Sequence, residues 1–284
     1  MKDNGVIEVN YLKFILPNVV FNCRVLGTGK NIIVAFHGFG QDGEVFLPFA
    51  TQHPGYTIYS FDLPFHGATK VADSEQCLEP KVIVNLISLL MASEHISRFS
   101  LLSFSIGSKL VFPIIKRFAD SIHQVWLMAP DGIVVNFWYR LATATYPGRA
   151  LFTRLMQHPA TYGHLLRVVG NLGLIHKNKI EYALNAIKNP AMGKQLSDTW
   201  IYLRQLNLES LEIADQINAH GIVCYFVLAS RDLVIDNSAI KPWSRKLKNT
   251  RIIKLPSSHA ALLRNFVTWS AKIFQANDPP DPSV

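Results

Sequence analysis

The feature that most constrains the fold of this chain is an alternation of short β-branched and aromatic runs with longer stretches of helical period. The predicted strands are 6–16, 19–27, 31–38, 56–64, 99–105, 124–131, 222–230 and 250–256. The predicted helices are 44–52, 80–94, 106–119, 238–247 and 260–275. Each helix lies between two strands or after the last one. The sequence therefore predicts an α/β fold, with an eight-stranded, mostly parallel sheet covered by helices on both faces.

One interval interrupts this alternation. Between about Val134 and Asp215 no run has the pattern of a strand, and several helical segments follow one another. These segments are expected at 136–146, 149–157, 161–170, 180–188 and 193–206. We interpret them as a helical cap inserted between the sixth and seventh strands, rich in aromatic side chains that pack the helices together, a few of them lining a pocket. The predicted division is a core of residues 1–133 and 216–275, a cap of residues 134–215 and a disordered tail of residues 276–284.

Composition and charge limit the class of function. A chain of 284 residues, 49% hydrophobic and 17% charged, can bury one large α/β core. The formal net charge is +8, but the basic residues are scattered and no recognition motif accompanies them, so we expect no nucleic-acid binding. Cys23, Cys77 and Cys224 are too few and too far apart for a disulfide framework or a zinc site. Cys23 and Cys224 are instead expected to be small buried side chains.

Targeting and cofactor signals are not found in the sequence. The N-terminal residues lack the apolar centre of a secretion signal, and no run approaches the roughly 18 apolar residues that a membrane span requires. We therefore expect a soluble protein in the cytoplasm. No metal-ligand cluster, phosphate-binding loop or dinucleotide motif is found, so no metal and no other cofactor is expected.

Ser105 is the candidate nucleophile. It stands in the sequence SFSIG, where a predicted strand ends and a predicted helix begins. A serine on such a sharp turn presents its hydroxyl above the carboxyl edge of the sheet, and the turn needs small residues on either side. Gly107 meets this need, while Ser103 stands where a glycine is usual. The pattern also arises by chance, so Ser105 needs partners elsewhere in the chain.

Two later positions supply those partners. Asp232 follows the seventh predicted strand, and His259 lies in the loop after the eighth. A serine hydroxyl becomes a nucleophile when a neighbouring base takes its proton, and that base needs a carboxylate to fix its tautomer. The order serine, aspartate, histidine is the one that occurs in this type of sheet.

A glycine-rich loop follows the third predicted strand. It reads His37-Gly38-Phe39-Gly40. Its backbone can direct an N–H group at an oxyanion, and we expect the Phe39 amide to form an oxyanion hole together with the Ile106 amide. His37 is interpreted as a residue that holds this loop.

The chain resembles the α/β-hydrolase superfamily over nearly its full length. The resemblance rests on five motifs in order: HGFG (37–40), FDLPFHG (61–67), SFSIG (103–107), ASRDLV (229–234) and SSHAAL (257–262). It implies an eight-stranded, mostly parallel sheet, a helical cap, and a triad of Ser105, Asp232 and His259. The sequence departs from the usual pattern at four positions where glycine is common: Ser103, Ala229, Ser258 and Phe65.

Other residues compete for these roles. Asp131 ends the sixth predicted strand and is the alternative acid, although Asp-Gly also favours a turn. Asp236 is a further candidate. His66 and His123 are rivals of His259, His66 with a structural interpretation and His123 at the opposite edge of the sheet. Arg231 is interpreted as a solvated or aspartate-paired side chain rather than a contact for an anionic substrate.

The predicted function is that of a serine hydrolase acting on a small to medium, partly apolar carboxylic ester. The same triad would also suit carbon–carbon bond hydrolysis, a lyase or an acyltransferase, and the scaffold would suit a ligand receptor without catalysis. Contact with an anionic membrane is a further alternative, suggested by arginines spaced along the predicted helices. Solvated helix faces explain these arginines equally well; examples are Arg140, Arg149, Arg154 and Arg167. The oligomeric state is not predicted.

Overall fold

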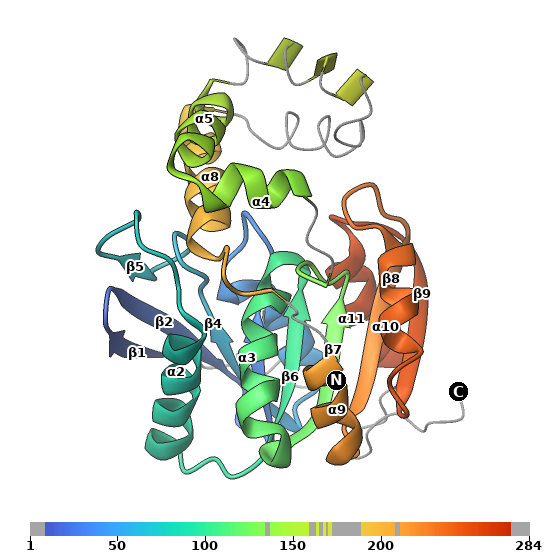
Figure 1. Ribbon diagram of the computed structural model, residues 1–284. Coiled ribbons are helices and arrows are strands. Elements are labelled where there is room, and N and C mark those ends of the chain that lie inside the picture. The colour runs from blue at the N-terminus through green and yellow to red at the C-terminus, as the bar shows by residue number, and fades with distance from the viewer. Residues whose placement is uncertain are drawn as a thin grey trace.

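A single mixed sheet organises the molecule. The computed structural model describes residues 9–133, 137–158, 189–207 and 211–273, and between them also 163–164, 167–168 and 170–171. The strands of this described part are β1 (Val9–Leu16), β2 (Val19–Leu26), β3 (Asn31–Phe36), β4 (Tyr56–Phe61), β5 (Lys70–Val71), β6 (Phe99–Phe104), β7 (Ile122–Met128), β8 (Val223–Arg231) and β9 (Thr250–Ser258). Their order in the sheet is β1-β2-β4-β3-β6-β7-β8-β9, with β5 paired to β2 (Figure 1).

The strands from β4 to β9 along this order run parallel, and β1 and β2 are antiparallel at one end. The predicted α/β class and the mostly parallel sheet are thereby confirmed, and each of the eight predicted strands is present. The additional strand is β5, which pairs antiparallel with β2. Two residues are too short a run to show an alternating pattern, so β5 could not be found from the sequence.

Helices cover both faces of the sheet because side chains alternate along each strand. Val34 and Phe36 of β3 belong to the buried cluster on one face, and Ile33 and Ala35 to the cluster on the other. The first face is covered by α2 (Pro80–Ser93), α3 (Ser108–Phe118), α9 (Leu211–Ala219) and α10 (Lys241–Ser244). The second is covered by α1 (Leu47–Gln52) and α11 (Leu262–Ile273). Figure 1 shows α2, α3 and α9 in front of the sheet.

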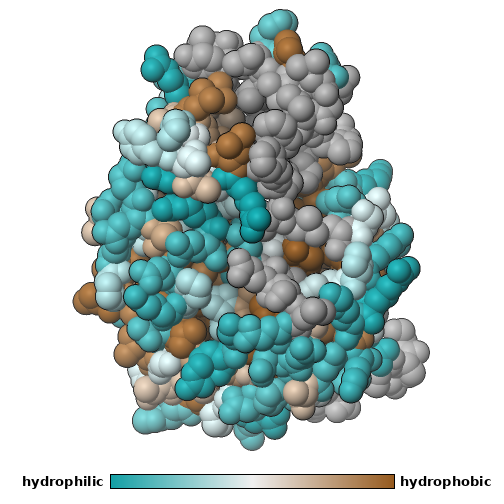
Figure 2. All heavy atoms as spheres, in the orientation of Figure 1, coloured by the Kyte–Doolittle hydropathy of each residue, from teal (hydrophilic) through white to brown (hydrophobic). Residues whose placement is uncertain are grey.

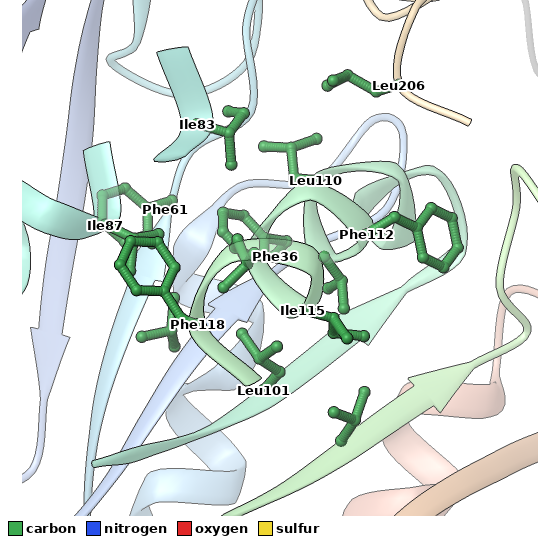
Figure 3. Packing of buried hydrophobic residues seen from close by; sticks show 14 of the residues in the cluster. Phe36, Phe61, Ile83, Ile87, Leu101, Leu110, Phe112, Ile115, Phe118 and Leu206 are labelled. Atoms are coloured by element: carbon green, nitrogen blue, oxygen red, sulfur yellow. The ribbon is translucent and has the colours of Figure 1, made fainter. Parts of the chain in front are cut away.

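The packing of α3 illustrates the core. Figure 3 shows Phe36 and Leu101 of the sheet against Leu110 and Ile115 of α3. All four side chains are fully buried, and burial of each contributes about 1.5–3 kcal/mol to folding. The helix that carries the turn at Ser105 is therefore held firmly on the sheet. Cys23 and Cys224 are buried and free, as expected.

Several predicted helices begin or end in short 3₁₀ turns. These are η1 (Gly43–Phe46) before α1, η2 (Ser105–Gly107) before α3, η3 (Ala119–Ser121) after it and η4 (Asn237–Ile240) before α10. The single helix predicted for 238–247 is thus a 3₁₀ turn followed by one turn of α-helix, with Pro242 in its first turn.

Three more helices, α4 (Phe137–Ala144), α5 (Tyr146–Gln157) and α8 (Pro190–Tyr202), lie above the carboxyl edge of the sheet (Figure 1). The Leu78 amide donates to the Tyr202 carbonyl at 2.8 Å, which joins the end of α8 to the core. The helix predicted at 180–188 and the predicted tail fall outside the described residues, as does half of the helix predicted at 161–170. Helix α9 crosses the predicted boundary at 215/216, and the division into core and cap stays a prediction. None of the described helices combines the length and apolarity needed to cross a membrane.

Candidate active site

Ser105 lies on a strained turn between β6 and α3. Its φ of 52° is in the left-handed region, which is unfavourable for a residue with a side chain. A Cβ at Gly107 would lie 2.4 Å from the His37 carbonyl oxygen, so only glycine fits there. Ser103 occupies the position where glycine is usual, and its Oγ lies 3.0 Å from Oγ of Ser108, which satisfies the extra hydroxyl. The turn is therefore compatible with the departure noted in the sequence.

His259 joins Ser105 to Asp232. Its Nδ1 lies 2.8 Å from Oδ2 of Asp232, and its Nε2 lies 3.0 Å from Oγ of Ser105. Because a carboxylate only accepts, Nδ1 carries the proton and Nε2 of the neutral ring accepts from the serine hydroxyl. The three side chains come from the ends of β6, β8 and β9, whose carboxyl ends meet at the same edge of the parallel sheet. The structure thus brings together the three residues singled out in the sequence.

Asp232 is held as a carboxylate. Its side chain is fully buried, and its Oδ1 accepts from the amides of Val234 and Ile235 at 2.8 Å each. Burial alone raises the pKa of Asp232, but the hydrogen bond and charge of His259 and the two amides outweigh burial, so the pKa lies below its usual value. Asp232 therefore places a negative charge beside Nδ1 of His259.

The alternative acids have other partners. Oδ2 of Asp131 lies 3.9 Å from Nζ of Lys109, and the Asp131 amide donates to the Ser105 carbonyl at 3.1 Å. Asp236 is the N-cap of η4, where its Oδ1 accepts from the Ser238 amide at 2.8 Å. The carboxylate that contacts Nδ1 of His259 is that of Asp232.

The loop 37–40 lies against the Ser105 turn. Two of its amides are engaged: Gly38 donates to Oε1 of Gln41 at 3.0 Å, and Gly40 donates to Nε2 of His66 at 3.1 Å. In the part of the chain that the structure describes, the Phe39 amide between them has no hydrogen-bond partner. The Ile106 amide belongs to the first turn of η2, where amides have no partner within the helix. These two amides remain available to a ligand.

His37 and His66 fasten this loop as neutral rings. Nε2 of His37 accepts from the Leu63 amide at 2.9 Å, and its Nδ1 donates to the Gly38 carbonyl at 2.7 Å. Burial lowers the pKa of His37 to about 3, and the neighbouring His66 ring adds to this effect. His66 donates from Nδ1 to the Pro64 carbonyl at 2.9 Å, and burial lowers its pKa as well. The structural interpretation of both histidines agrees with this geometry.

A buried lysine beside the site was not anticipated. Lys109 stands one helical turn after Ser105, and its Nζ donates to Oδ1 of Asn207 at 2.7 Å and to the Tyr139 hydroxyl at 3.4 Å. Burial lowers the pKa of Lys109, and Asp131 partly opposes that shift. The sequence signal that could have indicated a buried lysine is its position in the largely apolar segment SKLVFPIIKRF. Its contacts join α3 to α4 and to the residues after α8.

The remaining predicted positions lie apart from this group. His123 is exposed near the start of β7, and Arg231 is exposed at the end of β8. Phe65, which replaces a glycine of the usual pattern, has a φ of 65°. Its ring packs edge-on against Tyr202, and its carbonyl accepts from Gln195 at 2.7 Å, so contacts with α8 hold this unfavourable conformation. No three His, Cys, Asp or Glu side chains are grouped as a metal site within the described ranges.

Comparison with known proteins identifies the fold. Neither a protein-family model nor a curated protein matches this sequence. Among solved structures, MGS-M2, an α/β-hydrolase enzyme from a Medee basin deep-sea metagenome library, is similar with a TM-score of 0.67 and 13% identity, over 96% of this chain and 100% of that chain. A thermophilic esterase from Thermogutta terrifontis is similar with a TM-score of 0.65 and 13% identity, over 93% of this chain and 97% of that chain.

A bacterial membrane phospholipase A is similar with a TM-score of 0.61 and 16% identity, over 93% of this chain and 86% of that chain. Identities this low carry information about the fold alone. Together with the strand order and the turn at Ser105, these similarities confirm the resemblance found in the sequence. The chain has the α/β-hydrolase fold.

Proposed function

We propose that this protein is a serine hydrolase that cleaves a small to medium carboxylic ester. The observation that carries the proposal is the hydrogen-bonded series from Ser105 through His259 to Asp232, with heavy-atom distances of 3.0 and 2.8 Å. Distances in this range permit direct proton transfer from the serine to the imidazole. The left-handed turn holds the hydroxyl where the sheet edge meets the helices above it.

In the first half of the reaction, Oγ of Ser105 attacks the acyl carbon while Nε2 of His259 takes the hydroxyl proton. Asp232 stabilises the resulting imidazolium, since its carboxylate is kept charged by its surroundings. The carbonyl oxygen becomes an oxyanion, and the free amides of Phe39 and Ile106 donate to it. When the tetrahedral intermediate collapses, His259 gives its proton to the leaving alkoxide and an acyl-enzyme remains.

In the second half, a water molecule attacks the acyl-enzyme. His259 takes a proton from that water and returns it to Oγ of Ser105 as the carboxylic acid leaves. The same two amides stabilise the second oxyanion. Atoms balance without any cofactor, because water supplies the hydroxyl of the acid and the proton of the alcohol.

An apolar wall beside the loop supports a partly apolar substrate. The Phe39 side chain packs against a cluster formed by Met156 and Leu196, to which Phe152 and Trp200 also belong. The rings of Phe152 and Trp200 stack with centroids 5.8 Å apart. A substrate whose carbonyl oxygen meets the Phe39 amide would lie close to this cluster. The esterase and the phospholipase of the same fold are named for ester cleavage, which is consistent with this reaction.

The proposal is tested with a series of p-nitrophenyl esters of increasing acyl chain length. Ser105→Ala should abolish hydrolysis, while Ser258→Ala, which removes an exposed serine next to His259, should keep the wild-type rate. Product analysis by mass spectrometry distinguishes hydrolysis from acyl transfer and carbon–carbon cleavage. Full activity in Ser105→Ala would refute the proposal.

Other expectations from the sequence stay predictions. These are the location in the cytoplasm, the absence of a cofactor and the absence of nucleic-acid binding. Ligand binding without turnover by a folded wild-type protein would favour the receptor alternative.

A further inference from the structure

The chain has a long segment without acidic residues. Between Gly132 and Ile180 the sequence contains four arginines and two lysines, and neither aspartate nor glutamate. These six cations compare with a formal net charge of +8 for the whole chain. The excess of positive charge is therefore concentrated in this part of the sequence. Three of its arginines, Arg140, Arg149 and Arg154, belong to α4 and α5, which lie above the carboxyl edge of the sheet (Figure 1).

The outward side of α5 combines this charge with exposed apolar groups. Its members, which we name the α5 face, are Tyr146, Pro147, Ala150, Leu151 and Arg154. Their spacing places them on one side of the helix. All five are exposed, with 73% of Tyr146 and 58% of Leu151 accessible to solvent. Figure 2 shows hydrophobic residues among hydrophilic ones in this upper part of the molecule.

A groove runs along the α5 face, since Tyr146, Ala150 and Arg154 of that face are among its lining residues. It has a volume of about 490 Å³ and runs between α5, α8 and residues 74–75. Arg149, Arg154 and Lys194 are among its lining side chains, together with the acids Glu75 and Asp198. Lys194 and Asp198 form an ion pair with each other. Nε of Arg149 is buried and has no hydrogen-bond partner among the described residues. The groove thus offers the Nε donor of Arg149 to an anionic group.

We propose that the α5 face docks on an anionic lipid surface. The face carries an exposed tyrosine and leucine, one arginine and no acidic residue, and Arg149 lines the groove along it. This is the composition of a helix that lies in the headgroup region of a membrane. A symmetric dimer through this face would place the same positive surface against itself, which opposes self-association. Docking itself does not depend on the proposed function. Its use does, because docking would bring the helices above Ser105 to a lipid ester.

The test measures binding of the full chain to sedimenting vesicles of phosphatidylcholine, with and without phosphatidylserine. The wild type should bind the phosphatidylserine vesicles at low salt and lose most of that binding at high salt. Arg154→Gln should weaken binding about fivefold, and Leu151→Ser about tenfold. The matched controls are Lys248→Gln and Leu89→Ser, which remove an exposed cation and an exposed leucine elsewhere and should change binding less than about twofold.

Three outcomes would overturn the proposal. The first is that the wild type does not bind phosphatidylserine vesicles at low salt. The second is that the α5 variants and their controls lose vesicle binding to the same extent. The third is equally tight binding to soluble polyglutamate that Leu151→Ser leaves unchanged, which would assign the face to an acidic macromolecule. Hydrolysis of a soluble short-chain ester, measured on the same variants, should equal the wild-type rate. Vesicle binding is measured without catalysis, so its failure and a failure of the proposed function are distinguishable.

Discussion

The carboxyl edge of the sheet and the helices above it are held in different ways. At the edge, Ser105, His259 and Asp232 come from three parallel strands and are joined by hydrogen bonds of 3.0 and 2.8 Å. Above it, α8 meets the core near its C-terminal end, where Tyr202 is buried in the main cluster, and through the hydrogen bond from Gln195 to the Phe65 carbonyl. Strand pairing sets the geometry of the edge, whereas side-chain packing holds α8 against the core and against α5. We therefore expect changes at the edge to alter the chemical step, and changes in the helices to alter what binds.

The largest effect should come from the acid at the edge. Asp232→Asn leaves the shape of the site but removes the charge that stabilises the imidazolium, so kcat/KM should fall by about 10⁴-fold. The matched variant is Asp131→Asn, which removes the carboxylate near Lys109 and should cost less than about tenfold. Steady-state kinetics on one soluble ester measures both. A larger loss in Asp131→Asn than in Asp232→Asn would assign the acid to the end of β7.

The second effect concerns the loop that leaves the Phe39 amide free. His66→Leu removes the acceptor of the Gly40 amide, so the loop should lose its alignment and kcat should fall about 10²-fold with little change in KM. His66→Gln, which restores an acceptor, should recover much of the rate. A circular dichroism melt checks that both variants fold. Equal losses of kcat in the leucine and glutamine variants would show that the acceptor is not what matters.

The third effect is a pH dependence of stability. The folded-state pKa of His37 is about 3, below the value of about 6.5 in an unfolded chain. Its contribution to stability is complete above pH 6.5 and is lost as the pH falls toward 3, because the unfolded chain binds the proton first. The free energy of unfolding should therefore drop by about 2 kcal/mol from this group between pH 7 and 5. Urea titrations at several pH values measure the free energy of unfolding of the wild type and of His37→Gln. Between pH 7 and 5 this free energy should fall more steeply in the wild type. An equal fall in both proteins would contradict the low pKa of His37.

The smallest effect should come from the helices. Gln195→Leu removes the hydrogen bond to the Phe65 carbonyl and should lower the free energy of unfolding by about 1 kcal/mol. If α8 shapes the substrate site, KM should rise while kcat stays near the wild-type value. Thermal unfolding and steady-state kinetics on the ester of best turnover measure the two quantities. A fall in kcat without a change in KM would contradict the expectation that the edge sets the chemical step and the helices set binding.

The sequence predicted the residues at the carboxyl edge of the sheet better than the residues that hold the neighbouring loop and helices in place. Ser105, Asp232 and His259 could be found because residues that end parallel strands meet at one edge, whatever the loops do. Gln41 and Lys109 could not, since their roles depend on which backbone amide or side chain lies opposite them in the folded chain. Phe65 was visible only as a departure from glycine, and its left-handed backbone explains why glycine is common there.

The most direct test of the central claim is labelling with a fluorophosphonate, which reacts with an activated serine. Intact mass spectrometry and peptide mapping would compare the wild type with Ser105→Ala, with Ser258→Ala as the matched control. The account predicts one adduct on Ser105 that disappears in Ser105→Ala and persists in Ser258→Ala. An adduct on another serine, or none on a folded protein that hydrolyses esters, would contradict it.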